Sequence, residues 1–485
     1  MPPRRPERNP VSARLTDAAI DVHHTAKLAR FGPRLPRPTH LNLETDMLNR
    51  RHFLQTTSAT TASLIAAPAI VRGQNLNSKL QLGGIGCEGK GWSDISEMAS
   101  HEQSQFVGFC DVDLSRTENV RKLNPDAPVF QDYRELLEKL GDRIDAVTVS
   151  TPDHMHAFIA LDVMRQGKHV YCQKPLTHNV WEARQMALQA KQSNVITRLG
   201  NQIHSHEHYR TAVQAIQSGT IGKVKRVHSW CAATGHGKSF HISRPKNPVE
   251  PPKSLDWNLW VGVAPTREYG DWKIYHPWGW RDWQDFGNGA LGDFGCHILD
   301  PVFTALKIDK APLDFKADHS GMNDEVWPAQ TTVDYTFPGT QFTTAGNLQI
   351  TWYDGGRLPG TSGSHLPANE SLPRSGSLFI GENGSLVLPH VGAPKAYPDA
   401  KIEKSDNQNH YHGWIDGCIT DKQPSDGFDY GGPLTEAVLL GNIAVRYRGT
   451  KLSWDAAAMK ITNHAEANTW LRREYRDGWD IKPVS

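Results

Sequence analysis

Short apolar runs alternate with amphipathic stretches along residues 78–201, and this alternation restricts the possible fold more than any other feature. Such runs suit strands buried in a parallel sheet, and the stretches between them have the length of crossover helices. Six strands separated by helices over about 120 residues indicate a doubly wound parallel sheet. The apolar runs include 80–85, 105–110, 146–149, 169–172 and 195–199.

The first run leads into a glycine-rich turn, Gly84-Ile85-Gly86-Cys87-Glu88-Gly89, that fits the pattern G-x-G-x-x-G. Glycines in such a turn allow a tight bend, let backbone N–H groups approach a pyrophosphate, and let the next helix pack closely. The N-terminus of that helix adds unpaired N–H groups and a partial positive charge. The turn therefore predicts a dinucleotide site formed by Gly84, Gly86, Cys87, Glu88 and Gly89.

The second run ends at Asp111, about 20 residues beyond the turn, where a dinucleotide-binding chain places an acid for the ribose hydroxyls. A carboxylate there repels a 2′-phosphate, so NAD is favoured over NADP. Arg116 follows closely and leaves NADP as the alternative. The other role open to Asp111 is that of a helix cap or a solvated turn acid.

Polar residues also follow the later runs. Ser150, Thr151 and Pro152 come after the run at 146–149, and Lys174 comes after the run at 169–172. Ligands of doubly wound sheets bind outside the carboxyl ends of the strands. These residues are therefore expected beside the glycine turn and Asp111.

Capping signals mark the helices between the strands. Thr151 and Pro152 predict a helix that starts there and ends near Gln166. Asp132 and Glu135 have the spacing of a capping box, and Asn179 and Glu182 are expected to start the next helix.

Four segments together resemble the family of glucose–fructose oxidoreductase, inositol dehydrogenase and the rhizopine-catabolism protein, most closely its exported members. The resemblance runs over nearly all of residues 78–485. It rests on Gly84-Ile85-Gly86-Cys87-Glu88-Gly89, Ser150-Thr151-Pro152-Asp153-His154-Met155-His156, Cys172-Gln173-Lys174-Pro175-Leu176 and Gly289-Ala290-Leu291-Gly292-Asp293-Phe294-Gly295-Cys296-His297.

The resemblance implies a Rossmann domain over 78–201 and a C-terminal α/β domain over 202–485 with a large, open, mostly antiparallel sheet. The second domain would bind substrate and pair subunits into a dimer or tetramer. Its expected strands are 223–230, 330–337, 341–352 and 376–388, and its expected helices are 433–446 and 455–473.

The resemblance also implies catalytic roles. Lys174 would lie beside the substrate hydroxyl and the nicotinamide, and His297 would remove the hydroxyl proton as hydride leaves carbon. Asp293 precedes His297 by one helical turn and would orient it. Histidine titrates near neutral pH, and a lysine can steady a developing alkoxide. Taken singly, the alternatives are a helix-surface Asp/His pair and a solvated lysine.

One residue departs from the family pattern, because Gln173-Lys174-Pro175 stands where the family has Glu-Lys-Pro. Glutamine keeps the shape but removes a negative charge next to Lys174. His156, Gln173 and Gln202 complete the set of residues expected around the cofactor.

Two further clusters suggest substrate contacts. His204, His206 and His208 alternate, but no carboxylate or cysteine completes a metal set, so no metal is expected and His204 is instead placed near the substrate. An aromatic run before the Gly/Asp/His motif contains Trp280 and Arg281. Indoles stack on sugar C–H faces, although core packing explains such a run equally well.

The N-terminal part has a different composition. Arg50 and Arg51 precede Phe-Leu, a weakly apolar stretch and a small-residue cleavage site, so residues 47–73 resemble a twin-arginine export signal. An amphipathic helix with an arginine pair is the alternative. Residues 1–46 are rich in Arg and Pro and predict a disordered extension, or a start-site artefact if translation begins at Met47.

Charge and cysteine content narrow the classes of function. The net charge of +1 favours neither nucleic acid nor a membrane surface, no apolar run reaches the length of a membrane span, and the six cysteines suit free thiols. The sequence therefore predicts a periplasmic oxidoreductase that transfers hydride between a sugar or cyclitol and tightly held NAD. An NAD-assisted glycoside hydrolase or lyase and a non-catalytic sugar-binding protein remain as alternatives.

Overall fold

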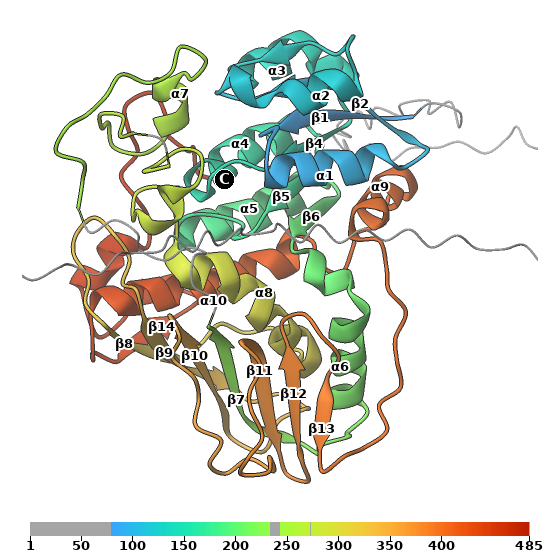
Figure 1. The fold of residues 1–485 in the computed structure, drawn as a ribbon, viewed down its shortest axis with the longest axis vertical. Helices are drawn as coiled ribbons and strands as arrows, with labels where there is room; N and C mark the ends of the chain where they lie inside the picture. Colours follow the sequence, from blue (N-terminus) through green and yellow to red (C-terminus); the bar gives the residue numbers. More distant parts are fainter. Residues whose placement is uncertain (1–78, 233–242, 272, 485) are drawn as a thin grey trace, which may run out of the picture. The chain divides into compact units, whose positions relative to one another are not determined.

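The computed structural model describes residues 79–232, 243–271 and 273–484 (Figure 1). The expected extension at 1–46 and export signal at 47–73 lie outside the described residues. No helix in the described part of the chain is long and apolar enough to cross a membrane. All six cysteines are buried free thiols, as the sequence suggests.

The first sheet has six parallel strands in the order β3-β2-β1-β4-β5-β6. The chain moves from β1 outward to β3 and then returns to the other side of β1 with β4, which confirms the doubly wound sheet. The strands are β1 (Leu80–Ile85), β2 (Ser104–Cys110), β3 (Val129–Phe130), β4 (Ala146–Val149), β5 (His169–Gln173) and β6 (Thr197–Gly200); the helices are α1 (Lys90–Ala99), α2 (Glu118–Leu123), α3 (Tyr133–Leu140), α4 (Asp153–Arg165) and α5 (Val180–Ser193).

The second sheet has nine strands in the order β13-β12-β11-β7-β10-β9-β8-β14-β15. Every neighbouring pair is antiparallel except β7 and β10, which confirms the expected large, mostly antiparallel sheet. The strands are β7 (Val224–Cys231), β8 (Asp314–His319), β9 (Thr331–Pro338), β10 (Asn347–Asp354), β11 (Ser375–Gly381), β12 (Ser385–Pro389), β13 (Lys395–Tyr397), β14 (Leu452–Asp455) and β15 (Lys460–Ile461).

Two long helices, α8 (Gly289–Leu306) and α10 (Phe428–Arg446), lie between the two sheets (Figure 1). Helix α8 contacts β7, β10 and β11, whereas α10 contacts β8, β9 and the Rossmann helix α5. Helix α6 (Glu207–Gln217) packs beside α8, and α9 (His410–Thr420) packs against α1. Late segments of the chain therefore reach the helix that follows the glycine turn.

The helix starts agree only in part with their sequence signals. Asn179 and Glu182 mark the start of α5 as expected, and the structure shows that they form a capping box. Asp132 caps α3 by accepting from the Arg134 N–H, but Glu135 pairs with Lys139 and completes no box. The expected Thr151 cap is wrong, because Pro152 holds an extended ψ of 152° and is itself the residue before α4.

Several C-terminal boundaries differ from expectation. The strand expected at 341–352 begins only at Asn347, because Gly346 makes a turn with a φ of 94°. The segment 376–388 forms two strands, β11 and β12, joined by a hairpin. The expected helix at 433–446 begins earlier, at Phe428.

The helix expected at 455–473 is wrong. This segment carries β14, β15 and a 3-10 turn at Glu466–Trp470. The Asn468 side chain accepts from the backbone N–H of Ile461 and donates to its carbonyl. Such side-chain bonds to the backbone compete with a helix, and an apolar periodicity does not reveal them.

Candidate active site

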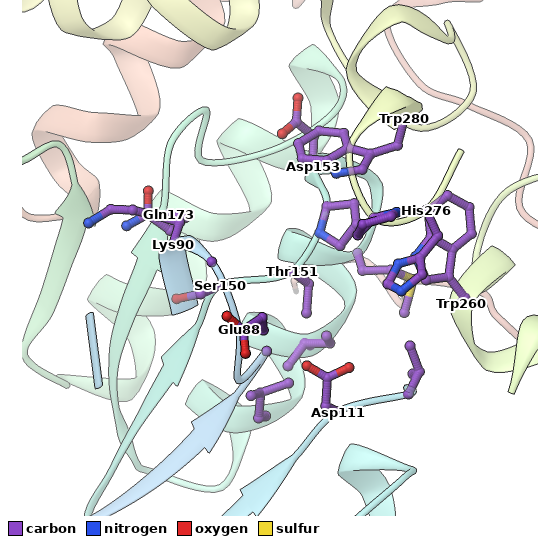
Figure 2. Close-up of a pocket in the computed structure, with 18 of the residues that line it drawn as sticks. Glu88, Lys90, Asp111, Ser150, Thr151, Asp153, Gln173, Trp260, His276 and Trp280 are labelled. Atoms are coloured by element: carbon purple, nitrogen blue, oxygen red, sulfur yellow. The ribbon is translucent and has the colours of Figure 1, made fainter. Parts of the chain in front are cut away.

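A cavity of about 670 Å³ opens at the carboxyl ends of β1, β2, β4 and β5. In Figure 2, Gln173, Lys90 and Ser150 lie to one side of it, and Trp280, His276 and Trp260 lie to the other. Residues expected at the site that line the cavity are Gly86, Glu88, Gly89, Asp111, Ser150, Thr151, Pro152, Gln173, Lys174, Gln202, Trp280, Arg281, Asp293 and His297.

The glycine turn is in a different register from the one expected. A Cβ on Gly86 would lie 2.5 Å from the Ser150 carbonyl oxygen, and one on Gly91 would lie 2.1 Å from the Gly86 carbonyl oxygen. Gly89 has a φ of 62°. Gly84 lies inside β1 and does not line the cavity. The close backbone contacts are therefore those of Gly86 and Gly91. A Cβ on Gly84 would lie 3.0 Å from Ile95 Cδ1 of α1, and the cofactor contact expected of Gly84 stays a prediction.

Asp111 follows β2 and lies against the turn. Its Oδ2 accepts from the Cys87 backbone N–H at 2.8 Å, and its Oδ1 accepts from the Asp113 N–H at 3.0 Å. Burial raises the pKa of Asp111, while these N–H bonds oppose the shift. Cys87 contributes only its backbone, since its thiol is wholly buried. Arg116 also lines the cavity.

Gln173 belongs to a buried network around Asp94. Asp94 Oδ2 accepts from Gln173 Nε2 at 2.7 Å and from Ser150 Oγ at 2.8 Å. Its Oδ1 pairs with Lys90 Nζ at 2.7 Å and accepts from Tyr411 Oη at 3.0 Å. The family pattern has a glutamate at position 173. In this chain Gln173 instead donates to the carboxylate of Asp94 on α1, so a carboxylate is still present next to position 173.

Lys174 is joined to α8 through Asp293. Its Nζ donates to the Asp293 carbonyl and to Oδ1, both at 2.7 Å. Burial alone would raise the pKa of Asp293, but Lys174 and Arg281 hold it well below its usual range. Asp153 lines the same wall and accepts from Asn288 Nδ2 at 3.2 Å. The lysine therefore sits among carboxyl groups in a mostly buried setting.

His297 lies one turn after Asp293 on α8. Burial lowers its pKa well below the usual value, and the charges of Lys174 and His390 add to that shift. Its ring centroid is 5.5 Å from that of His390, which lines the cavity from the end of β12. The structure thus brings Lys174, Asp293 and His297 to one cavity, where the imidazole is neutral.

Two histidines expected at the site lie behind it. His156 binds the Thr151 carbonyl at 2.7 Å and the Pro175 carbonyl at 2.8 Å, so it supports the loops that carry cavity residues. His204 pairs with the buried Asp300 at 3.1 Å. Neither lines the cavity, so a direct contact of His156 with cofactor or of His204 with substrate is not supported by the geometry.

The expected aromatic contacts are at the cavity. The Arg281 guanidinium lies 4.2 Å from the ring centroid of Trp280 and 4.4 Å from that of Trp278. Arg281 Nε is 3.6 Å from Asp293 Oδ1. Trp283 and Tyr275, from the same run, are core residues. The run therefore contributes residues both to the cavity wall and to the core, and the contact with a sugar stays a prediction.

The segment that carries these aromatics also packs on the loop after Asp111. The Leu114 N–H donates to the Ser254 carbonyl, and the Asp256 N–H donates to the Val112 carbonyl, both at 2.9 Å. His276 Nε2 lies 3.1 Å from Asp113 Oδ2. The loop expected to bind the ribose is thus in contact with residues 254–276 of the C-terminal domain.

The residues of the site and its support that the sequence patterns do not reveal include Lys90, Gly91, Asp94, Asp153 and His390. Gly91 was detectable, because it follows Gly89 by two residues. Asp153 follows Pro152 directly in a segment already selected. His390 lies in a loop far along the chain and had no local signal.

No group of three or more His, Cys, Asp or Glu side chains suited to a metal occurs within residues 79–232, 243–271 and 273–484. The His206 and His208 rings are 4.9 Å apart, whereas His204 faces Asp300. His206 and His208 are thus in contact with each other, whereas the His204 side chain turns to Asp300.

Comparisons with known proteins agree with this architecture. The model of the Gfo/Idh/MocA oxidoreductase family, NAD-binding Rossmann fold, matches residues 82–201, and the model of the family's C-terminal alpha/beta domain matches residues 208–349. An alpha-N-acetylgalactosaminidase from Shewanella oneidensis is 24% identical over 291 residues, which are 54% of this chain and 56% of that protein. The chain spans about half the length of the curated relatives it matches.

Solved structures of other proteins share the fold, among them the following two. The WlbA dehydrogenase from Bordetella pertussis, in complex with NADH and UDP-GlcNAcA, is 16% identical with a TM-score of 0.55, covering 78% of this chain and 99% of that one. Aldose-aldose oxidoreductase from Caulobacter crescentus, complexed with glycerol, is 16% identical with a TM-score of 0.54, covering 78% and 100%. With both family models matched in order over the two sheets, the chain belongs to the Gfo/Idh/MocA family of NAD-binding oxidoreductases.

Proposed function

We propose that the cavity holds NAD and that a hydroxyl-bearing carbon of a sugar or cyclitol exchanges a hydride with it. The observation that carries this proposal is the meeting of two sets of residues in one cavity. Gly86 and Asp111 line it at the ends of β1 and β2, while Lys174, Asp293 and His297 line it beside α8.

The residues fit a dinucleotide. A Cβ at Gly86 or Gly91 would collide with backbone, so the turn lies close against the strand and the next loop, as a pyrophosphate-binding turn does. Asp111 suits the ribose hydroxyls of NAD, which is favoured over NADP, although Arg116 lies near enough to serve a 2′-phosphate. When bound, NAD supplies the hydride acceptor.

The remaining chemistry falls to side chains of this chain. His297 accepts the proton of the substrate hydroxyl, since its imidazole is neutral at pH 7. Lys174 Nζ donates to the developing alkoxide, and Asp293 holds that ammonium in place at 2.7 Å. Trp280 and Arg281 would pack on the sugar ring.

The proposed cofactor is testable on the purified protein. Denaturation is expected to release about one NAD per chain, because the segment docked on the ribose loop impedes exchange. Protein that releases no nicotinamide dinucleotide, and binds none in calorimetry, would contradict both the site and its retention. Release of NADP instead would assign the ribose end to Arg116.

Asp153 gives the activity an expected pH dependence. Burial raises the pKa of Asp153 to about 7; Lys174 opposes that shift and Asp293 adds to it. The carboxyl is therefore neutral below pH 7 and charged above it, where it repels a developing alkoxide. Turnover is expected to fall as the pH rises through 7, and D153N should remove this fall. An unchanged profile in D153N would exclude Asp153 as its source.

A second candidate function is NAD-assisted glycoside hydrolysis, by transient oxidation and elimination. Curated relatives named glycosyl hydrolase family 109 favour it, as does a cavity with His390 and Asp153 as additional acid/base groups. Release of an aryl group from aryl glycosides, without net NADH, would select this function. Oxidation of free sugars with net NADH would select the dehydrogenase. If the protein shows neither activity, a non-catalytic sugar-binding protein is the remaining candidate.

The cellular setting is also a proposal. The twin-arginine pattern at 47–73 supports export of the folded protein to the periplasm with NAD already bound. The open second sheet supports a dimer or tetramer. Cell fractionation and light scattering test these two proposals separately.

A further inference from the structure

Asn201 lies between His297 and a buried carboxylate. Its side chain is wholly buried, and its Nδ2 donates to the Cys296 carbonyl at 3.0 Å and to Asp300 Oδ2 at 2.6 Å. A backbone carbonyl can only accept, so the amide orientation is fixed. Asn201 Oδ1 therefore faces His297 Nδ1 and accepts a hydrogen bond from it.

The carboxylate behind the amide reinforces this orientation. Asp300 also accepts from Tyr209 at 2.8 Å and from Tyr430, and it pairs with His204 at 3.1 Å. Burial alone would lower the pKa of His204, but Asp300 and Asp426 raise it. Asp300 is therefore surrounded by donors and acts as an acceptor. An acceptor at this place favours the amide orientation in which Asn201 Nδ2 points to Asp300.

We infer that Asn201 fixes the tautomer of His297, with the proton on Nδ1 and the lone pair on Nε2 available to the cavity. Among the described residues, none hydrogen-bonds to Nε2 in this arrangement. An amide oxygen cannot take up a proton at neutral pH, so any proton exchange by His297 passes through Nε2. Asn201 is thus a positioning residue. The tautomer follows from the hydrogen bonds alone, whereas the expected effect on kcat rests on the proposed function.

The charges around His297 leave this assignment unchanged. Lys174, at the end of β5, and Lys90, on α1, oppose a positive imidazole, whereas Asp293, one turn earlier on α8, favours it. His390 faces the ring from the end of β12, and burial lowers the pKa of His390 to about 4. These groups shift the pKa of His297. Of the residues named in this subsection, Asn201 is the one that hydrogen-bonds to Nδ1, so the other groups leave the tautomer unchanged.

The test compares N201L, which offers His297 no acceptor, with N201D/D300N, which keeps an acceptor and leaves one carboxylate and one amide in the buried pair. We expect kcat to fall about 100-fold or more in N201L with KM nearly unchanged, because Nε2 then carries the proton. N201D/D300N should retain far more activity, with the acid limb of its pH profile moved upward, since a carboxylate at position 201 favours the charged imidazole. Asn468 binds backbone away from the cavity, so N468L is the matched control.

A readout independent of turnover uses nitrogen-15 NMR of histidine-labelled protein, with the signals of His297 assigned by their loss in H297N. Wild-type protein should show the proton on Nδ1, and N201L should show it on Nε2. A proton on Nε2 in the wild type, or full kcat in N201L, would overturn the inference. A wild type that turns over no sugar would instead refute the proposed function, while the NMR result would still decide the tautomer.

Discussion

Replacing Lys174 by methionine is expected to lower kcat/KM for the sugar about 10²–10³-fold while NAD remains bound. Nζ of Lys174 lies beside α8, where it bonds Asp293 Oδ1 and the Asp293 carbonyl at 2.7 Å. Methionine keeps the length of the side chain and removes the donor that would steady the alkoxide. Steady-state kinetics and the NAD content of denatured protein measure the two effects.

Controls separate lost chemistry from lost stability. K174M removes the 2.7 Å partner of Asp293 and leaves it the longer contact with Arg281 at 3.6 Å, so K174M/D293N should recover stability without recovering turnover. Lys139 is half-exposed and pairs with Glu135, so K139M should keep full activity. If K174M kept more than about a tenth of the wild-type rate, the role given to Lys174 would be wrong.

Restoring the acid that the family carries at position 173 is expected to harm this chain. Q173E would set a second buried carboxyl against Asp94, at a contact that now measures 2.7 Å. Asp94 is wholly buried and Gln173 nearly so, so repulsion and desolvation should cost about 3 kcal/mol or more. Urea unfolding should show this loss, together with weaker NAD retention, because Asp94 also holds Ser150 and Lys90 at the cavity.

The reciprocal exchange is the decisive control. D94N/Q173E moves the carboxylate back to position 173 and keeps one amide in the pair, so stability and NAD retention should recover to near wild type. If Q173E alone is as stable as the wild type, the carboxylate on Asp94 does not substitute for the family's glutamate. If D94N/Q173E is no more stable than Q173E and retains no more NAD, the geometry of the pair matters more than its charge.

The Rossmann sheet could be predicted because its signals are local. Buried parallel strands give continuous apolar runs, and Asn179 and Glu182 mark a helix start by their spacing alone. In the glycine turn the sequence pattern starts at Gly84, whereas the closest backbone contacts lie at Gly86 and Gly91. Only the distance between Gly91 and the Gly86 carbonyl separates the two registers.

The supports of the site could not be predicted, because they connect residues remote in the chain. Tyr411 reaches Asp94, and Asn201 reaches α8, with no periodicity that links the partners. The same limitation explains His204: its spacing suggested a ligand-facing side chain, whereas a buried carboxylate on α8 binds it. Most of the polar residues that line the cavity follow from motifs, but His390 does not, and the residues that hold them in place are seen only in the structure.

Reduction of the bound cofactor in a single turnover shows whether Lys174 acts on a substrate beside NAD. Protein as purified is mixed with a panel of sugars and cyclitols, and the absorbance of reduced nicotinamide is followed without added NAD. We expect at least one compound to reduce the bound NAD in wild-type protein and to fail to do so in K174M. If K174M forms reduced nicotinamide as fast as the wild type, Lys174 has no role in hydride transfer and the proposed site is wrong.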